Sequence, residues 1–114
     1  MGSSGWLLRD GAVMCATEVA DSFAARARGL LGRDGIDGAL LLPRTRAVHT
    51  LGMRFAVDVA FLDRSMTVLE TQTLVPWRVT VPRVRARAVL EAEAGAFERW
   101  GLQAGDRLEL RAHP

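Results

Sequence analysis

The segment from Phe55 to Leu62 constrains the fold more than any other part of the chain. Bulky apolar residues alternate there with small residues, with Asp58 and with a final leucine. A period of two is typical of a β-strand, because successive side chains point to opposite faces of a sheet. A turn at 63–65 and a β-prone segment at 67–74 predict that this strand pairs with the next as a hairpin.

Short strands and two helices account for the rest of the chain. A helix should begin after Asp21 or Ser22, which are good N-cap residues, and end at Gly32. Its apolar stripe comprises Phe23, Ala27, Leu30 and Leu31. A shorter helix is expected at 95–100. Further strands are predicted at residues 6–8, 12–19, 39–42, 47–50, 86–92 and 106–111.

These elements predict an α+β fold with a mostly antiparallel, strongly curved sheet or a small barrel-like β structure, and with one longer and one short helix. The length of 114 residues fits one domain over 6–112, preceded by a flexible Gly/Ser-rich leader at 1–5. The sequence contains neither a long apolar run nor a secretory signal, and its single cysteine cannot form an internal disulfide. We therefore expect a soluble, cytoplasmic monomer with no membrane partner.

Asp58 is the most informative single residue for function. Aspartate is depleted in strands, and a bare carboxylate between two covered faces would cost several kcal/mol, so it needs partners. Arg54 shares its face, but four strand residues span roughly 13 Å, which is too far for a direct pair. The better candidates are Arg26, Arg28, Arg44 and Arg46.

No catalytic residue is assigned from the sequence. His49 is the only histidine away from the chain end and can act as a general base, although a half-buried, hydrogen-bonded role is commoner. Cys15 would formally complete a set with His49 and Asp58, but it falls on the apolar face of its strand pattern, so a core thiol is expected. One cysteine and one useful histidine cannot build a closed zinc site. We expect no metal and no cofactor.

A basic stretch follows the central hairpin, with no acidic residue from Thr71 to Leu90. Arginine beside an aromatic residue can bind phosphate or stack on a nucleobase. The formal net charge is only +2, however, and nucleic-acid binders usually show a stronger imbalance, so nucleic acid is an unlikely partner. The candidate residues for anion or nucleic-acid contacts are Trp77, Arg78, Arg83, Arg85 and Arg87.

Three blocks of the sequence resemble the "domain of unknown function 192" family. They are Arg26–Arg33, His49–Asp63, and a closing block with Val89-Leu90-Glu91 and Gly101–Asp106. Leu31 stands where the family usually has methionine, and Ala56 replaces a frequent proline. The resemblance implies a compact, β-rich α+β fold of bacteria and archaea with no established activity. We therefore expect a bacterial protein of uncharacterised function.

Our leading hypothesis is a non-enzymatic binding or accessory module. Its ligand would be a small anion, such as a carboxylate, phosphate or sugar acid, or the tail of a partner protein. The predicted ligand-binding residues are Arg26, Arg28, His49, Thr50, Arg54 and Asp58. One alternative is a hydrolase or transferase that uses His49 and Asp58. Another is a purely structural cluster, in which an arginine locks the helix to the sheet through Asp58, with nucleic-acid or anion contacts made by Arg78–Arg87.

Overall fold

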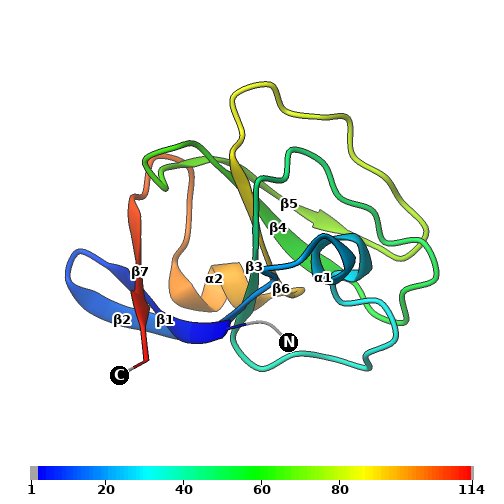
Figure 1. Cartoon of the computed structure of the whole chain (residues 1–114), viewed down its shortest axis with the longest axis horizontal. Coiled ribbons are helices and arrows are strands. Elements are labelled where there is room, and N and C mark those ends of the chain that lie inside the picture. The colour runs from blue at the N-terminus through cyan, green and yellow to red at the C-terminus, as the bar shows by residue number, and fades with distance from the viewer. Residues whose placement is uncertain (1–2, 114) are drawn as a thin grey trace.

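A single seven-stranded sheet organises the protein, with two short helices packed against it (Figure 1). The structure is a computed structural model that describes residues 3–113. Its elements in chain order are β1 Ser3–Arg9, β2 Ala12–Val19, α1 Phe23–Arg28, β3 Ala39–Pro43, β4 Val57–Leu62, β5 Val68–Leu74, β6 Ala88–Glu93, α2 Ala96–Trp100 and β7 Leu108–Ala112. The strand order is β5-β4-β6-β3-β2-β1-β7.

The sheet is curved but not closed, so it matches the predicted curved sheet rather than the predicted barrel-like structure. All neighbouring strands run antiparallel except β2 and β3, which are parallel. The edge strands β5 and β7 are not neighbours in the sheet; next to one end of each, Thr67 and Arg107 form an isolated bridge. The α+β, β-rich prediction is therefore confirmed. None of the helices in residues 3–113 is long and apolar enough to cross a bilayer.

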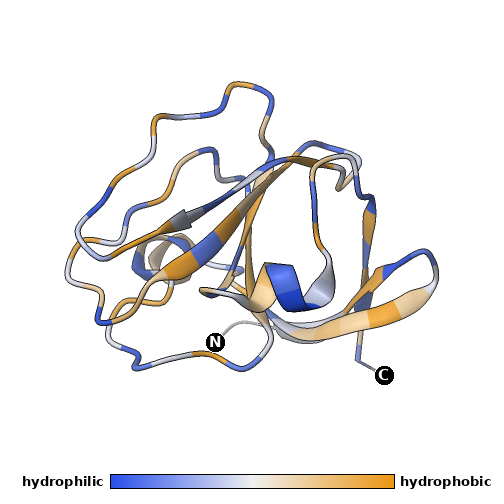
Figure 2. Cartoon of the chain, turned by 180° about the vertical axis from the view of Figure 1, so that it is seen from behind, coloured by the Kyte–Doolittle hydropathy of each residue, from blue (hydrophilic) through white to orange (hydrophobic). Residues whose placement is uncertain are grey.

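Strand β4 is buried along its whole length, which the alternating pattern anticipated. Val57, Val59 and Phe61 pack in one apolar cluster, while Ala60 and Leu62 pack in the other. Helix α2 supplies Ala96 and Phe97 to the second cluster, whereas α1 and the segment after β3 cover the first. Apolar colouring runs along much of the sheet in Figure 2. The two faces of the sheet thus have separate cores.

Two sequence predictions were wrong at the ends of elements. Ser3 to Gly5, expected in a flexible leader, extend β1 and pair with residues 17–19 of β2; Met1 and Gly2 lie outside the described residues. Helix α1 ends at Gly29 rather than Gly32, so both helices are short. Six residues make less than two turns, and the predicted stripe is only partly buried: Leu30 is 1% exposed, whereas Phe23 is 80% exposed.

The segment 47–50 also differs from its prediction. It forms an isolated bridge between His49 and Val79 rather than a strand of the sheet. Its neighbour is the long loop at 75–87 that connects β5 to β6, and the two segments run side by side away from the sheet (Figure 1). The residues that the sequence analysis assigned to one site are therefore distributed over several places.

Candidate functional site

Asp58 has a structural role, as one of the sequence-based alternatives proposed, but with partners other than the expected arginines. The residue is 4% exposed on β4. Its Oδ1 accepts a hydrogen bond from Thr73 Oγ1 at 2.6 Å, and its Oδ2 accepts from the backbone N–H groups of Gly95 at 3.0 Å and Phe97 at 3.1 Å. The expected arginine partners were wrong. Gly95 is the N-cap of α2 and has no side chain to offer, so Asp58 supplies the capping oxygen from the sheet.

Two other predicted ligand residues also serve the architecture. Thr50 is fully buried, where its hydroxyl donates to the Val75 carbonyl at 2.7 Å and accepts from Arg78 N–H at 2.9 Å. Arg54 lies on the surface and forms an ion pair with Asp34 at 2.8 Å. Neither side chain lines a cavity together with the remaining candidates.

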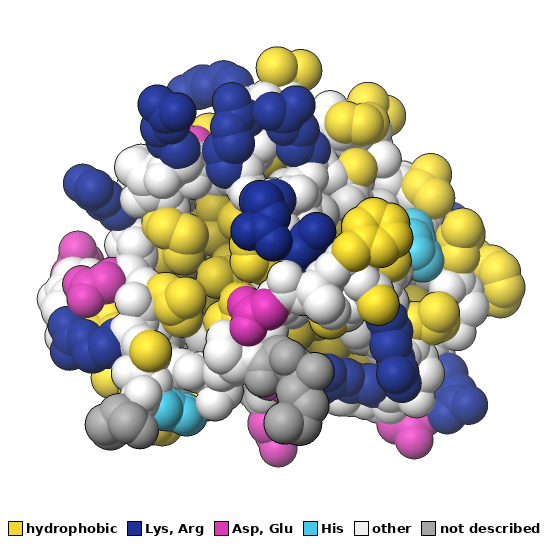
Figure 3. All heavy atoms as spheres, in the orientation of Figure 1, with side chains coloured by type: hydrophobic (Ala, Val, Ile, Leu, Met, Phe, Trp, Pro, Cys, Tyr) yellow, Lys and Arg dark blue, Asp and Glu magenta, His cyan; other side chains and the backbone are white. Residues whose placement is uncertain are grey.

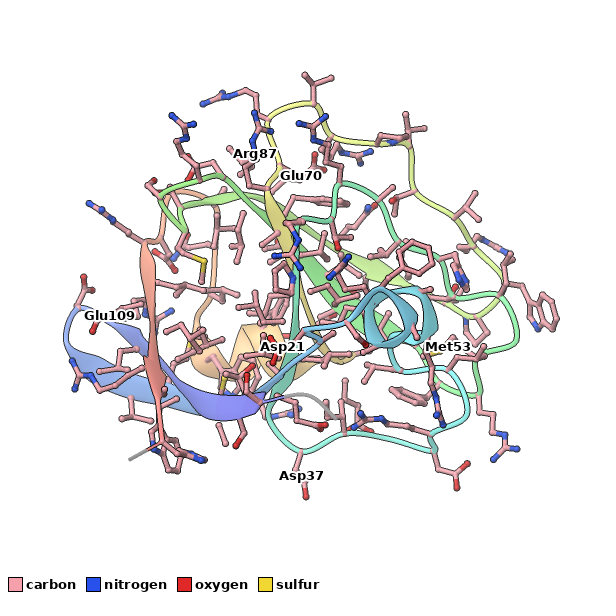
Figure 4. The ribbon with its side chains drawn as sticks, in the orientation of Figure 1. Asp21, Asp37, Met53, Glu70, Arg87 and Glu109 are labelled. Atoms are coloured by element: carbon pink, nitrogen blue, oxygen red, sulfur yellow. The ribbon has the colours of Figure 1, made fainter. Side chains whose placement is uncertain are left out.

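The remaining three candidates do come together. Arg26, Arg28 and His49 line a cavity of about 130 Å³ between the end of α1 and the segment after β3. Arg26 Nη1 donates to the backbone carbonyl of Asp21 at 3.2 Å, close to the start of the helix (Figure 4). Arg28 Nε donates to the Leu31 carbonyl at 3.2 Å. Each arginine uses one guanidinium donor in these contacts, which leaves its other N–H groups available.

Glu91 forms the inner wall of this cavity. It lies on β6 between Leu40 of β3 and Val59 of β4, and it is 4% exposed. Its Oε1 finds no hydrogen-bond partner within residues 3–113. Burial raises the pKa of Glu91 from its ordinary value to about 7. A buried polar atom without a partner costs about 1–3 kcal/mol, and such atoms are rare enough to require an explanation.

Gly29 makes room for this carboxyl. Its φ of +53° belongs to the left-handed region, and a Cβ placed there would lie 3.2 Å from Glu91 Oε1. The glycine therefore both ends α1 and leaves space for the carboxyl beside the cavity. A larger residue would push into the space that Oε1 faces.

The cavity is suited to binding rather than to nucleophilic chemistry. The hydrolase hypothesis with His49 and Asp58 is not supported, because Glu91, which shares the cavity with His49, pairs with Val59 and so lies on the sheet face opposite to Asp58. Cys15 belongs to the core on the Asp58 side, and burial raises its pKa to about 11. Within the described part of the chain, no three His, Cys, Asp or Glu residues are grouped to hold a metal.

The basic stretch is a separate surface. Its five predicted residues lie on the 75–87 loop, where Arg83 pairs with Glu70 at 2.6 Å. None of them lines the Glu91 cavity. The residues predicted for anion or nucleic-acid contacts therefore remain candidates for a second function.

Sequence reasoning missed Glu91, although a signal was present. Glu91 interrupts the otherwise apolar run of residues 88–92 in β6. The same argument drew attention to Asp58 in β4. What the sequence could not reveal is that three donors satisfy Asp58, whereas one oxygen of Glu91 has none.

Comparisons with known proteins agree with this fold. The family model DUF192, described as an uncharacterized ACR, matches residues 7–110. A UPF0127 protein of Pyrococcus abyssi is 37% identical over 97 residues, which cover 81% of this chain and 83% of that protein. A crystal structure of a protein of unknown function from Novosphingobium aromaticivorans has a TM-score of 0.77 and 21% identity, covering 95% of this chain and 84% of its own. One from Sinorhizobium meliloti, named as a proposed transcription regulator, has a TM-score of 0.79 and 24% identity, covering 96% and 94%. Identities this low show the fold alone.

Proposed function

The chain belongs to the DUF192 family, as its three sequence blocks predicted, and we propose that it is a small binding module whose Glu91 cavity takes a hydroxylated anion. The family is uncharacterised, so the proposal rests on the geometry of the cavity. The observation that carries it is the unpartnered Oε1 of Glu91, which faces a cavity edged by Arg26 and Arg28.

The two ends of the cavity select different chemical groups. A ligand hydroxyl can donate to the buried Oε1 of Glu91 and remove the cost of leaving that oxygen unpaired. The guanidinium groups of Arg26 and Arg28 favour a carboxylate or phosphate, which they can bind through two N–H donors at once. A hydroxyl close to a carboxylate is the arrangement found in 2-hydroxy acids and at the acid end of sugar acids.

The size of the cavity limits what can enter. A volume of about 130 Å³ corresponds to about four water molecules at about 30 Å³ each. A molecule such as glycolate or lactate fits entirely, whereas a sugar acid would insert only its acid end. An inserted anion also lies close to Glu91, so binding should be stronger when that carboxyl is protonated and neutral.

An NMR titration tests the proposal. Backbone amide signals are followed while glycolate, lactate, gluconate, glucuronate or inorganic phosphate is added to millimolar concentration. We expect the signals of Gly29, His49 and Glu91 to move with a hydroxy acid, and the affinity to fall as pH rises through about 7. The His49→Gln variant removes the histidine of the cavity, so any pH dependence of binding that remains in this variant is assigned to Glu91.

Two variants separate binding from folding. Glu91→Leu removes the hydrogen-bonding oxygen but suits an apolar core, so it should abolish binding while the protein stays folded. Arg54→Gln is the matched control, because Arg54 is an exposed arginine outside the cavity and should bind like the parent. The proposal fails if no cavity signal moves with any of the five anions, or if Glu91→Leu binds as tightly as the parent.

We also propose a cytoplasmic, bacterial setting for this module, acting as a monomer. A single free thiol buried in the core, Cys15, is compatible with a reducing compartment. Cell fractionation with an antibody against the native protein would test the compartment, and sedimentation equilibrium would test the monomer.

A further inference from the structure

The loop at 75–87 turns most of its apolar side chains into solvent. Its large apolar residues are between 48% and 79% exposed, and they are Val75, Trp77, Val79, Val81 and Val84. The first four occupy alternate positions of the chain. The ribbon of this loop projects beyond the sheet, and its colouring alternates between apolar and polar (Figures 1 and 2). Apolar residues scattered singly on a surface are ordinary, but five within ten positions are not.

This exposure is not the result of a loose loop. Trp77 N–H donates to the Thr50 carbonyl at 2.9 Å, and Thr80 N–H donates to the Val48 carbonyl at 2.9 Å. Arg83 N–H donates to the Arg46 carbonyl, also at 2.9 Å. The backbone is therefore fixed along the segment 46–50. The apolar side chains point outward from a backbone whose hydrogen bonds are already formed. Burying these side chains against a partner would therefore cost little conformational entropy.

Arginines stand between these apolar residues. Arg78, Arg85 and Arg87 are exposed and form no salt bridge with any residue in 3–113. Glu70, which lies near the base of the loop (Figure 4), is already paired with Arg83, and Asp63 is close enough to Arg85 to feel its charge. The space-filling view shows basic and apolar side chains gathered together along the edge that the loop forms (Figure 3). The loop therefore carries an excess of positive charge beside its apolar side chains.

We propose that the 75–87 loop docks onto an anionic lipid bilayer surface. The valines and Trp77 would enter the interfacial region, where tryptophan is favoured, while the arginines bind lipid phosphates. A bilayer accepts separate protruding side chains without a matching pocket, which suits a projecting loop. This goes against the expectation, drawn from the sequence, that membranes play no part. The proposal is independent of the Glu91 cavity.

Other occupants fit the loop less well. A symmetric contact with a second copy would place these arginines against each other, and like charges oppose such an interface. Nucleic acid would use the arginines and Trp77, but four exposed valines add nothing to phosphate or base recognition. Of these three occupants, only a lipid surface uses the charge and the apolar exposure together.

Vesicle co-sedimentation tests the proposal with the full chain. Vesicles of phosphatidylcholine alone are compared with vesicles containing 30% phosphatidylglycerol, at low and at high salt. We expect binding to the anionic vesicles, at least tenfold weaker binding to the neutral ones, and loss of binding at high salt. Val79→Asp should weaken the binding about tenfold or more, and Arg85→Gln about fivefold.

Matched variants make the result specific to the loop. Val13→Asp changes an exposed valine of the β1–β2 hairpin, and Arg107→Gln changes an exposed arginine of the segment before β7; both should bind like the parent. Thermal melts confirm that each variant is folded. The proposal is overturned if the parent does not bind anionic vesicles, if Val13→Asp weakens binding as much as Val79→Asp, or if a 30-nucleotide RNA binds the loop and vesicles do not.

Discussion

The cap that Asp58 provides to α2 allows a sharp test of how this fold is held together. In Asp58→Ala, the N–H groups of Gly95 and Phe97 both lose their acceptor, and the second of these is buried. An unpaired buried donor costs about 1–3 kcal/mol, and loss of a helix N-cap costs about 1 kcal/mol. Thr73 is exposed and can turn its hydroxyl to water. The expected loss is therefore about 2–4 kcal/mol.

Asp58→Asn should be much milder, because an amide oxygen can accept the same two backbone N–H groups. The amide nitrogen would then face Thr73 Oγ1, which can accept a hydrogen bond as well as donate one. Only the strengthening due to charge is lost, at about 1–2 kcal/mol. If Asp58 were paired with a buried arginine, as the sequence suggested, the asparagine variant would cost several kcal/mol, because a charge would be stranded.

Urea denaturation followed by tryptophan fluorescence measures these differences as shifts of the midpoint at constant slope. Thr73→Val serves as the control: it should cost about 1 kcal/mol in the parent and almost nothing in Asp58→Ala, because its partner is already absent. The reasoning is refuted if Asp58→Ala costs less than about 1 kcal/mol, or if the asparagine and alanine variants lose the same stability.

Three further outcomes can be checked on the folded chain. Because burial raises the pKa of Glu91 from 4.5 to about 7, the folded protein keeps a proton that the unfolded chain releases. The free energy of unfolding, measured by urea titration, should therefore fall by about 3 kcal/mol as the pH rises from 4.5 to about 7. Glu91→Leu should remove this dependence of stability on pH. Gly38→Ala should lower the free energy of unfolding by more than about 2 kcal/mol in a thermal melt, because Gly38 has a φ of +73° and an added Cβ would overlap the Ala16 carbonyl oxygen. Gly11→Ala is the control: Gly11 has a φ of +79° but open space around it, so the loss should be only about 1 kcal/mol. Cys15 should react with a thiol reagent at pH 8 only as fast as the protein unfolds, since its thiol is buried and its pKa is about 11; rapid labelling of the folded protein would contradict this.

The sequence predicted what local periodicity controls. The alternation in β4 identified its strand and its two faces correctly, because both faces are covered and each must therefore be apolar. The end of α1 was placed three residues too late, because Gly29 and Gly32 are equally good stop signals in a sequence. Both adopt positive φ, but only Gly29 faces the Glu91 carboxyl. That choice depends on a strand more than fifty residues further along the chain.

Only part of the candidate site could be predicted, because the partners of a polar residue also depend on segments far along the chain. Arg26, Arg28 and His49 were expected to share a site, and they line one cavity. Thr50 and Asp58 carry equally polar side chains, yet their partners lie 15 to 39 positions away and satisfy them completely. Residue type and spacing show that a buried polar group needs partners. They do not show whether the fold supplies those partners.

The two buried carboxylates of the central sheet make this distinction directly. Asp58 and Glu91 lie on the neighbouring strands β4 and β6, one residue apart in register and on opposite faces. Three protein donors bind Asp58, so its charge is used to fix α2. Oε1 of Glu91 has no such donor among the described residues, so no hydrogen bond compensates the cost of burying it, and its burial destabilises the fold. Replacing it by leucine should raise stability above pH 7 and remove binding together, which is the pattern expected where a residue is kept for function rather than for folding.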